Sequence, residues 1–329
     1  MPTSKPHSAP RTPPGQKPPL EVVDPKWLLK ALAICVVAAL VCAYATLCLL
    51  FYQGRWQLVL HPSHIVDRTP ASAGLVYSEV HFDAAETGQP RLTAWSIPAV
   101  PQAEFVSRYA AYTILYLHDG SGSLSDTVPM LARLHSAGLN VFAIDYRGFG
   151  ASEASPHPTQ ERMSEDTAAA LKYLIQTRHV PSRNIIPYGV GLGAPLAANL
   201  ANSHADLPGV VLDNPDPDPA ATAAVAHPSG VIPTRLLFGH QFEIAAMLVK
   251  LATPKLLIAG GPDVATSAPD SNRLQVLFKQ AHSPSFTVTL PRVHADQAYQ
   301  AALTRFFDQY LPDLKDAPAS RPIRADTAP

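Results

Sequence analysis

Three glycines at alternate positions place the tightest limit on how this chain can fold. Gly189, Gly191 and Gly193 follow the apolar run Ile185–Tyr188, which has the length and composition of a buried strand, and they precede a stretch of small residues typical of a helix. Glycine accepts backbone conformations and close approaches that other residues avoid. We therefore expect a strand that turns sharply into a helix at this point.

Around this turn, segments rich in β-branched and aromatic residues alternate with helical patterns, which indicates a mostly parallel sheet flanked by helices. The first two predicted strands alternate in polarity and should be antiparallel, whereas the others read as buried. The strands are predicted at Leu75–Phe82, Arg91–Ile97, Tyr112–Leu117, Val141–Asp145, Ile185–Tyr188, Val210–Asp213 and Lys255–Ile258. The clearest helices are predicted over Glu161–Arg178 and from about Ala295 to Tyr310, with a less regular cap between Pro215 and Thr253.

An uncharged apolar run lies near the N-terminus. From Ala31 to Tyr52 it has about 22 residues, the length that a helix needs to cross a bilayer. Lysine and arginine are more frequent before this run than after it, so the positive-inside rule puts the N-terminus in the cytoplasm and the rest of the chain outside. We expect a single-pass anchor in the cell membrane. A cleavable signal peptide is the alternative, because Ala43-Tyr44-Ala45 resembles a cleavage site.

The predicted layout has four parts. Residues 1–30 are rich in proline and are expected to form a disordered cytoplasmic tail. Residues 31–52 form the transmembrane helix and thereby make the lipid bilayer a partner. Residues 53–312 form the folded domain, and residues 313–329, rich in proline and alanine, are expected to be a disordered tail.

Composition argues against several classes of function. A net charge of −1 offers no basic surface for nucleic acid. All three cysteines, Cys35, Cys42 and Cys48, lie in the apolar run, so the folded domain has no thiol, and its histidines are scattered. The glycine turn lacks the lysine of a phosphate-binding loop and the spacing of a dinucleotide site. We expect neither a metal nor another cofactor.

The chain resembles the α/β-hydrolase superfamily, particularly its serine aminopeptidase-like branch, which includes single-pass membrane-anchored members. The resemblance covers roughly Arg55 to Leu311. It rests on the glycine turn, which is similar to the GxSxG turn, on the segment Asp145–Ser152, which matches DYRGxGxS, and on Leu117–Gly122, which is similar to the oxyanion loop. It implies an α/β-hydrolase fold, in which a mostly parallel eight-stranded sheet has helices on both faces and a short cap, preceded by one transmembrane helix.

The resemblance also implies a catalytic site, which departs from the family pattern at two positions. Asp263 matches the acid and His294 the base, and the backbone N–H groups of Gly120 and Leu192 match the oxyanion donors. Gly191 stands at the nucleophile position, where the family has serine. In the oxyanion loop, Asp119 stands where glycine is usual.

Three functions are left open by the missing hydroxyl. In the preferred interpretation, the chain is a non-catalytic or weakly active relative that binds a small acyl, lipid or peptide ligand. Alternatively, His294 activates a water above Gly191, or Ser121 or Ser123 replaces the lost nucleophile. Either alternative would make the chain a hydrolase of esters, thioesters or peptides.

Polar residues outside this constellation have simpler interpretations. Asp213, Asp216 and Asp218 follow a predicted strand, and the prolines between them favour a solvated loop over an alternative catalytic acid or a cation site. Arg147 is expected to anchor its loop by charge-assisted hydrogen bonds.

Overall fold

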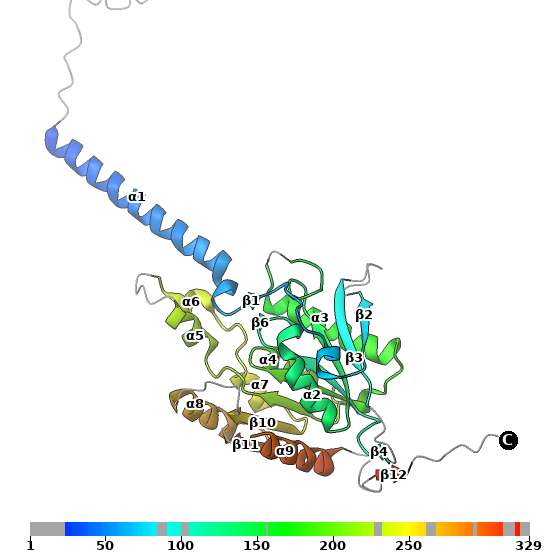
Figure 1. Ribbon diagram of the computed structural model, residues 1–329. Coiled ribbons are helices and arrows are strands. Elements are labelled where there is room, and N and C mark those ends of the chain that lie inside the picture. The colour runs from blue at the N-terminus through cyan, green and yellow to red at the C-terminus, as the bar shows by residue number, and fades with distance from the viewer. Residues whose placement is uncertain are drawn as a thin grey trace, which may run out of the picture. The chain divides into compact units, whose positions relative to one another are not determined.

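The computed structural model describes residues 24–83, 91–99, 105–155, 157–226, 232–260, 268–291, 295–311 and 320–322. The chain divides into two compact units, Met1–Leu50 and Phe51–Pro329. Figure 1 shows helix α1 (Pro25–Gly54) as one continuous helix. It is apolar along most of its length, and none of its residues is buried. Among the described residues, one helix is long and apolar enough to cross a membrane, and it is the one that begins at Pro25. The expected apolar helix therefore forms, beginning six residues before Ala31.

The second unit is built on an eight-stranded sheet with the order β11-β10-β9-β8-β5-β7-β3-β2. Its strands are β2 (Ser78–Phe82), β3 (Leu92–Ile97), β5 (Thr113–Leu117), β7 (Asn140–Asp145), β8 (Ile185–Val190), β9 (Val210–Asp213), β10 (Lys255–Gly260) and β11 (Ser285–Leu290). The pairs β2–β3 and β3–β7 are antiparallel, and the remaining pairs are parallel. The predicted fold class is confirmed.

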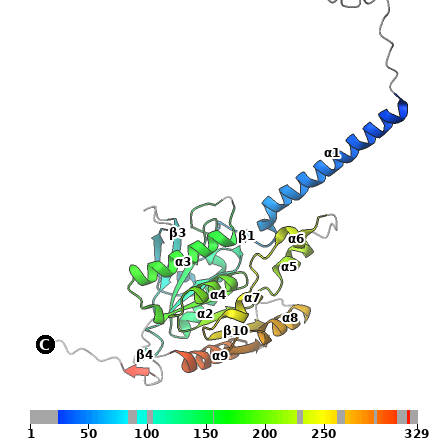
Figure 2. The same ribbon diagram turned by 180° about the vertical axis from the view of Figure 1, so that it is seen from behind.

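Helices cover both faces of this sheet (Figures 1 and 2). They are α2 (Val128–Ser136), α3 (Gln160–Gln176), α4 (Gly193–Ser203), α7 (Ala245–Lys250), α8 (Ala268–Lys279) and α9 (Ala295–Tyr310). Between β9 and α7, the cap contributes α5 (Pro219–Ala226) and α6 (Thr234–Phe238). The stretch predicted to be an irregular cap, Pro215–Thr253, therefore contains three short helices among its described residues: α5, α6 and α7.

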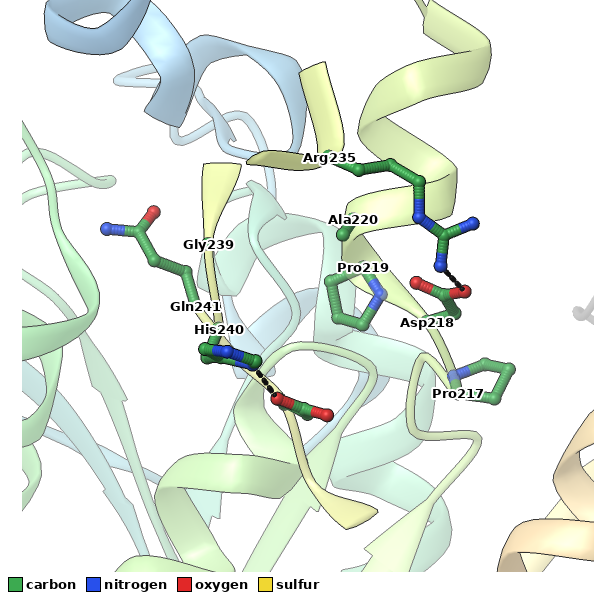
Figure 3. A pocket seen from close by; sticks show the side chains of 9 residues that line it. Pro217, Asp218, Pro219, Ala220, Arg235, Gly239, His240 and Gln241 are labelled. Atoms are coloured by element: carbon green, nitrogen blue, oxygen red, sulfur yellow. Dashed lines mark hydrogen bonds and ion pairs between the residues drawn. The ribbon is translucent and has the colours of Figure 1, made fainter. Parts of the chain in front are cut away.

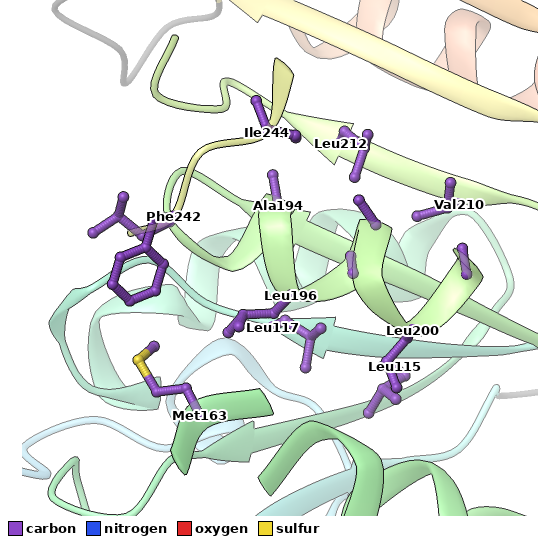
Figure 4. Close-up of a cluster of buried hydrophobic side chains, with 14 of the residues drawn as sticks. Leu115, Leu117, Met163, Ala194, Leu196, Leu200, Val210, Leu212, Phe242 and Ile244 are labelled. Atoms are coloured by element: carbon purple, nitrogen blue, oxygen red, sulfur yellow. The ribbon is translucent and has the colours of Figure 1, made fainter. Parts of the chain in front are cut away.

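Two hydrophobic clusters hold these layers together, one on each face of the sheet. Successive side chains of a strand point to opposite faces, so Leu115 and Leu117 pack with α3 and α4, whereas Ile114 and Tyr116 pack with α2 and α9. Figure 4 shows the first cluster, in which leucines of α4 meet those of β5. Because β5 and β8 lie in the middle of the sheet, the turn after β8 is held between packed layers.

Two elements differ from the sequence-based expectation. No strand is predicted at Ser285–Leu290, where β11 forms the sheet edge; exposed and partly buried residues alternate along it, so its pattern is weakly apolar. The C-terminal tail, expected to be disordered, contains β12 (Ser320–Pro322), which pairs antiparallel with β4 (Phe105–Ser107). The sequence gives no signal for β12, because serine, arginine and proline are not among the β-branched and aromatic residues enriched in strands.

Candidate functional site

The glycine turn has the geometry that its sequence predicts. Strand β8 ends at Val190, helix α4 begins at Gly193, and Gly191 between them has a left-handed backbone with φ +53°. The Gly191 N–H donates to the Asp213 carbonyl at 2.9 Å, which ties the turn to the end of β9. The turn is thus fixed at the carboxyl ends of the two neighbouring strands β8 and β9.

The flanking glycines are required by close approaches. A Cβ on Gly189 would lie 2.3 Å from the Gly193 carbonyl oxygen, and a Cβ on Gly193 would lie 2.3 Å from that of Leu117. Both distances are far inside van der Waals contact, and both partners are backbone atoms that cannot move aside. Any side chain at either position would therefore push α4 away from the sheet.

The space above Gly191 is filled by a carboxylate. A Cβ on Gly191 would lie 2.3 Å from Oδ1 of Asp119 and 2.6 Å from its Cγ. Asp119 and Gly191 are the two positions at which the sequence departs from the family pattern. In space they are complementary, because the glycine leaves the volume that the aspartate occupies.

The same carboxylate accepts two backbone hydrogen bonds. Oδ1 of Asp119 accepts the Gly120 N–H at 2.7 Å and the Leu192 N–H at 2.8 Å. These are the two predicted oxyanion donors, and the structure brings them together on one oxygen atom. Leu192 is also the residue before α4, where the helix dipole and the free N–H groups favour a negative charge.

The side chain of His118 holds the backbone of the loop that carries Asp119. The His118 side chain is 1% exposed, and its Nδ1 lies 2.6 Å from the Asp119 carbonyl oxygen. Burial lowers the pKa of His118 to about 4, so the imidazole is neutral at physiological pH and donates from Nδ1 to that carbonyl. The hydroxyl of Tyr146 donates to the His118 carbonyl at 3.0 Å. The backbone on which Asp119 depends is therefore fixed.

The two serines considered as substitute nucleophiles have different surroundings. Ser123 is completely buried, and its Oγ donates to the Ile65 carbonyl at 3.0 Å and accepts the Ser125 N–H at 3.3 Å as the cap of a short 3-10 helix. Ser121 is exposed on β6 (Ser121–Gly122), which pairs with β1 (His61–Pro62). The Ser123 hydroxyl is therefore held in two structural hydrogen bonds, whereas Ser121 is exposed to solvent.

The predicted acid and base, Asp263 and His294, lie outside the described residues. Strand β10 ends three residues before the first and α9 begins directly after the second. Among the described residues, no group of three or more His, Cys, Asp or Glu side chains could hold a metal ion.

Asp213 corrects one expectation. It is buried rather than solvated: its carboxylate accepts from the Tyr188 hydroxyl and, at 2.8 Å, from Nδ2 of Asn214. Burial raises its pKa to about 6. The Tyr188 hydroxyl also lies 2.7 Å from that of Tyr299 on α9. Sequence reasoning missed this network, although both tyrosines lie on faces predicted to be buried, where a hydroxyl needs a partner.

The cap contains a polar pocket of about 310 Å³ next to α6. Two ion pairs line it: Arg235 with Asp218, at 2.8 Å, and His240 with Glu243, at 2.6 Å. Figure 3 shows Arg235 reaching from α6 across to Asp218. Its lining residues come from the cap alone and do not include the residues of the glycine turn.

Comparison with known proteins agrees with this architecture. Residues 110–237 match the family model for serine aminopeptidase, S33. The chain is 28% identical over 148 residues to the α/β-hydrolase domain-containing protein WAV2 of Arabidopsis thaliana, with 44% of this chain and 45% of that protein covered. An uncharacterized protein of Mycobacterium tuberculosis is 26% identical over 264 residues, which cover 80% of this chain and 88% of the relative.

Solved structures share the fold. An esterase of Pyrococcus furiosus superposes with a TM-score of 0.57 at 17% identity, with 77% of this chain and 99% of the esterase covered. At that identity the likeness speaks for the fold and not for the reaction. Its strand order and glycine turn, the match of residues 110–237 to the family model and the likeness to these structures together show that the chain has the α/β-hydrolase fold.

Proposed function

We propose that this chain is a membrane-anchored α/β-hydrolase-fold protein that binds a small acyl, lipid or peptide ligand without cleaving it. The observation that carries the proposal is the position of Asp119, whose Oδ1 accepts both N–H groups that an active relative would offer to an oxyanion. In addition, Gly191 has no hydroxyl that could act as the nucleophile.

Two separate parts of the chemistry are then missing. Loss of the nucleophile alone lowers the rate of a serine protease by roughly 10⁶, and the roughly 10³ to 10⁴ over water that survives comes from the oxyanion donors and binding. Here those donors already hold a carboxylate, so a developing oxyanion would meet a negative charge instead of free N–H groups. The residual catalysis should therefore be lost as well.

The same contacts weigh against the hydrolase alternatives. Water activated by His294 would still form an oxyanion, and Asp119 would have to leave before Gly120 and Leu192 could stabilise it. Ser123 would have to give up its cap and its buried position to serve as a nucleophile. Ser121 is exposed, but it lies in the loop whose backbone N–H at Gly120 holds Asp119.

The membrane part of the proposal rests on α1. The uncharged run from Ala31 to Tyr52 lies within this helix, and none of its side chains is buried, as suits a helix surrounded by lipid. The surplus of lysine and arginine before it supports a cytoplasmic N-terminus and a folded domain outside. Reporter fusions at each terminus would test this orientation, and a reporter active on the same side at both ends would overturn it.

The decisive experiment restores both departures from the family pattern. We would compare the unmodified chain with Gly191→Ser, Asp119→Gly and the double variant, using fluorophosphonate labelling and turnover of short-chain p-nitrophenyl esters. The unmodified chain should be silent. Gly191→Ser alone should be nearly silent, since the new Cβ meets Asp119 and the oxyanion donors stay occupied. The double variant should react at least about 10²-fold faster than Gly191→Ser, the effect of regaining one oxyanion donor.

Controls separate chemistry from folding. His294→Ala in the double variant should abolish labelling, and circular dichroism should be the same for all variants. Ester turnover by the unmodified chain that disappears with His294→Ala would contradict the proposal and support activated water. Labelling of the unmodified chain that disappears with Ser121→Ala would support a substitute nucleophile instead.

A further inference from the structure

Helix α5 is apolar apart from Thr222, and it is only partly covered. Its sequence, Pro219–Ala226, contains no charged residue. A helix without a polar face is normally buried in a core or in lipid. Yet among its described side chains only Pro219 and Ala223 are buried, and Val225 is 79% exposed. Within the part of the chain that the structure describes, the Val225 side of α5 is therefore largely uncovered.

Helix α6 presents a second apolar side chain beside it. The two helices are in contact and lie side by side in both views (Figures 1 and 2). Phe238 of α6 is completely buried, whereas Leu236 is 78% exposed. Val225 and Leu236, which we call the cap face, are the two most exposed large apolar side chains among the described residues of the second unit.

The cap face is tied to the point where the chain leaves α1. Nη1 of Arg55, the first residue after that helix, donates to the Leu237 carbonyl of α6 at 3.2 Å. The Arg55 guanidinium lies 3.9 Å from the centre of the Tyr52 ring, and Trp56 follows it. Tyrosine and tryptophan are the residues that concentrate where a spanning helix meets the headgroup layer.

We propose that the cap face rests on the lipid bilayer, at the boundary between headgroups and acyl chains. This inference rests on the membrane anchoring of α1 proposed above. If α1 spans the membrane, Arg55 lies at the interface, and its hydrogen bond keeps α6 within the same layer. Arg235, next to Leu236, is 67% exposed, and its guanidinium has further N–H donors for lipid phosphates besides the nitrogen that pairs with Asp218.

This placement gives α6 two roles. Arg235 lines the polar pocket of the cap, and the adjacent Leu236 belongs to the cap face. A ligand held in the cap would thus lie one helix away from the bilayer surface. The proposal commits to lipid as the occupant of the cap face; a second copy of the chain and plain water are outcomes that the test distinguishes.

The test measures immersion depth with spin labels in the full chain. Cys35, Cys42 and Cys48 are replaced by serine, and single cysteines are introduced as Leu236→Cys, Val225→Cys and, as a matched control on α8, Val276→Cys, a position that is 57% exposed. A fourth chain keeps Cys42 alone as a reporter of α1. Each chain is reconstituted in phosphatidylcholine–phosphatidylglycerol vesicles, and collisions with oxygen and with a neutral nickel chelate are recorded.

The expected result is a several-fold higher ratio of oxygen to nickel accessibility at positions 225 and 236 than at position 276. High nickel accessibility at both cap positions, with Cys42 in lipid, would overturn the inference while leaving the anchor intact. Low accessibility to both reagents would mean that protein covers the cap face, which also overturns it. Nickel access at Cys42 would instead refute the proposed anchoring.

Discussion

Two carboxylates on neighbouring strands are held by the same local device. Asp119 follows β5 and lies against Gly191, whose φ is +53°, and Asp145 ends β7 and lies against Gly150, whose φ is +48°. A Cβ on the glycine would lie 2.3 Å from a carboxylate oxygen in the first case and 1.9 Å in the second. Each carboxylate also accepts two backbone N–H groups.

The two sites differ in burial. Asp145 is 1% exposed, and burial raises its pKa to about 6, whereas Asp119 is exposed. Asp145 belongs to a segment whose arginine, Arg147, binds Asp166 at 2.6 Å and anchors the loop, as the sequence predicts. If catalysis has been lost as proposed, Asp119 now fills the nucleophile position above Gly191 in the same way that Asp145 fills the space above Gly150 in a structural loop. The two sites share their geometry, but we expect substitutions at the buried Asp145 site to lower the free energy of unfolding more than substitutions at the exposed Asp119 site.

The largest effect is expected for Gly150→Ala. The new Cβ would overlap the Asp145 carboxylate, which has no solvent to move into, and the left-handed backbone adds a further cost. Overpacking and backbone strain together should lower the free energy of unfolding by about 4 kcal/mol. Urea unfolding in detergent would measure this.

Gly74→Ala is the matched control for that variant. Gly74 also has a left-handed backbone, with φ +74°, but a Cβ there would meet nothing within 4 Å. Gly74→Ala should therefore lower the free energy of unfolding only by the cost of the left-handed backbone, about 1 kcal/mol. Equal losses for Gly150→Ala and Gly74→Ala would mean that the contact with Asp145 does not matter.

A pH titration sharpens the difference in burial. Because burial raises the Asp145 pKa from 3.8 to about 6, the folded chain binds more protons than the unfolded chain between these values. The contribution of Asp145 to stability is therefore greatest below pH 4 and is lost as the pH rises through about 6. Relative to Asp145→Asn, the unmodified chain should lose at most about 3 kcal/mol between pH 4 and pH 7.

The comparison with the variant is needed because His118, whose Nε2 lies 3.6 Å from Oδ1 of Asp145, acts in the opposite direction. Its pKa is lowered to about 4 by burial, so its contribution rises between pH 4 and 6.5. Urea unfolding at several pH values would give both curves. A constant difference between the two chains would contradict the burial argument.

Gly191→Ala should have a smaller effect than Gly150→Ala. The exposed Asp119 carboxylate can swing away from the new Cβ, although it then gives up its hydrogen bonds to Gly120 and Leu192. We expect a loss of about 2 kcal/mol, of which about half is backbone strain. In a double-mutant cycle with Asp119→Ala, the coupling should be about 1 kcal/mol. Additive effects would show that the two side chains do not compete for one space.

The sequence predicts the backbone of this site better than it predicts the position of the Asp119 side chain. Close approaches of backbone require glycine at 189 and 193, so these residues can be recognised in the sequence, and Gly120 and Leu192 follow from chain position. The direction of the Asp119 side chain cannot be read in the same way, because it depends on the empty volume above Gly191, a residue 72 positions later in the chain. For the same reason Asp213 was misread: its partner Tyr188 meets it only across paired strands.

The smallest effect is expected for Asp119→Ala alone. The alanine removes an acceptor, but water can reach the freed N–H groups of Gly120 and Leu192 because the position is exposed. The loss should be about 1 kcal/mol or less, and Asp119→Asn, which keeps one carbonyl acceptor, should lose less still. A loss as large as that of Gly150→Ala would mean that the two carboxylates are equally structural. The glycine turn would then depend on Asp119 for its shape, and in that case the double variant with Gly191→Ser should unfold rather than gain a reactive serine.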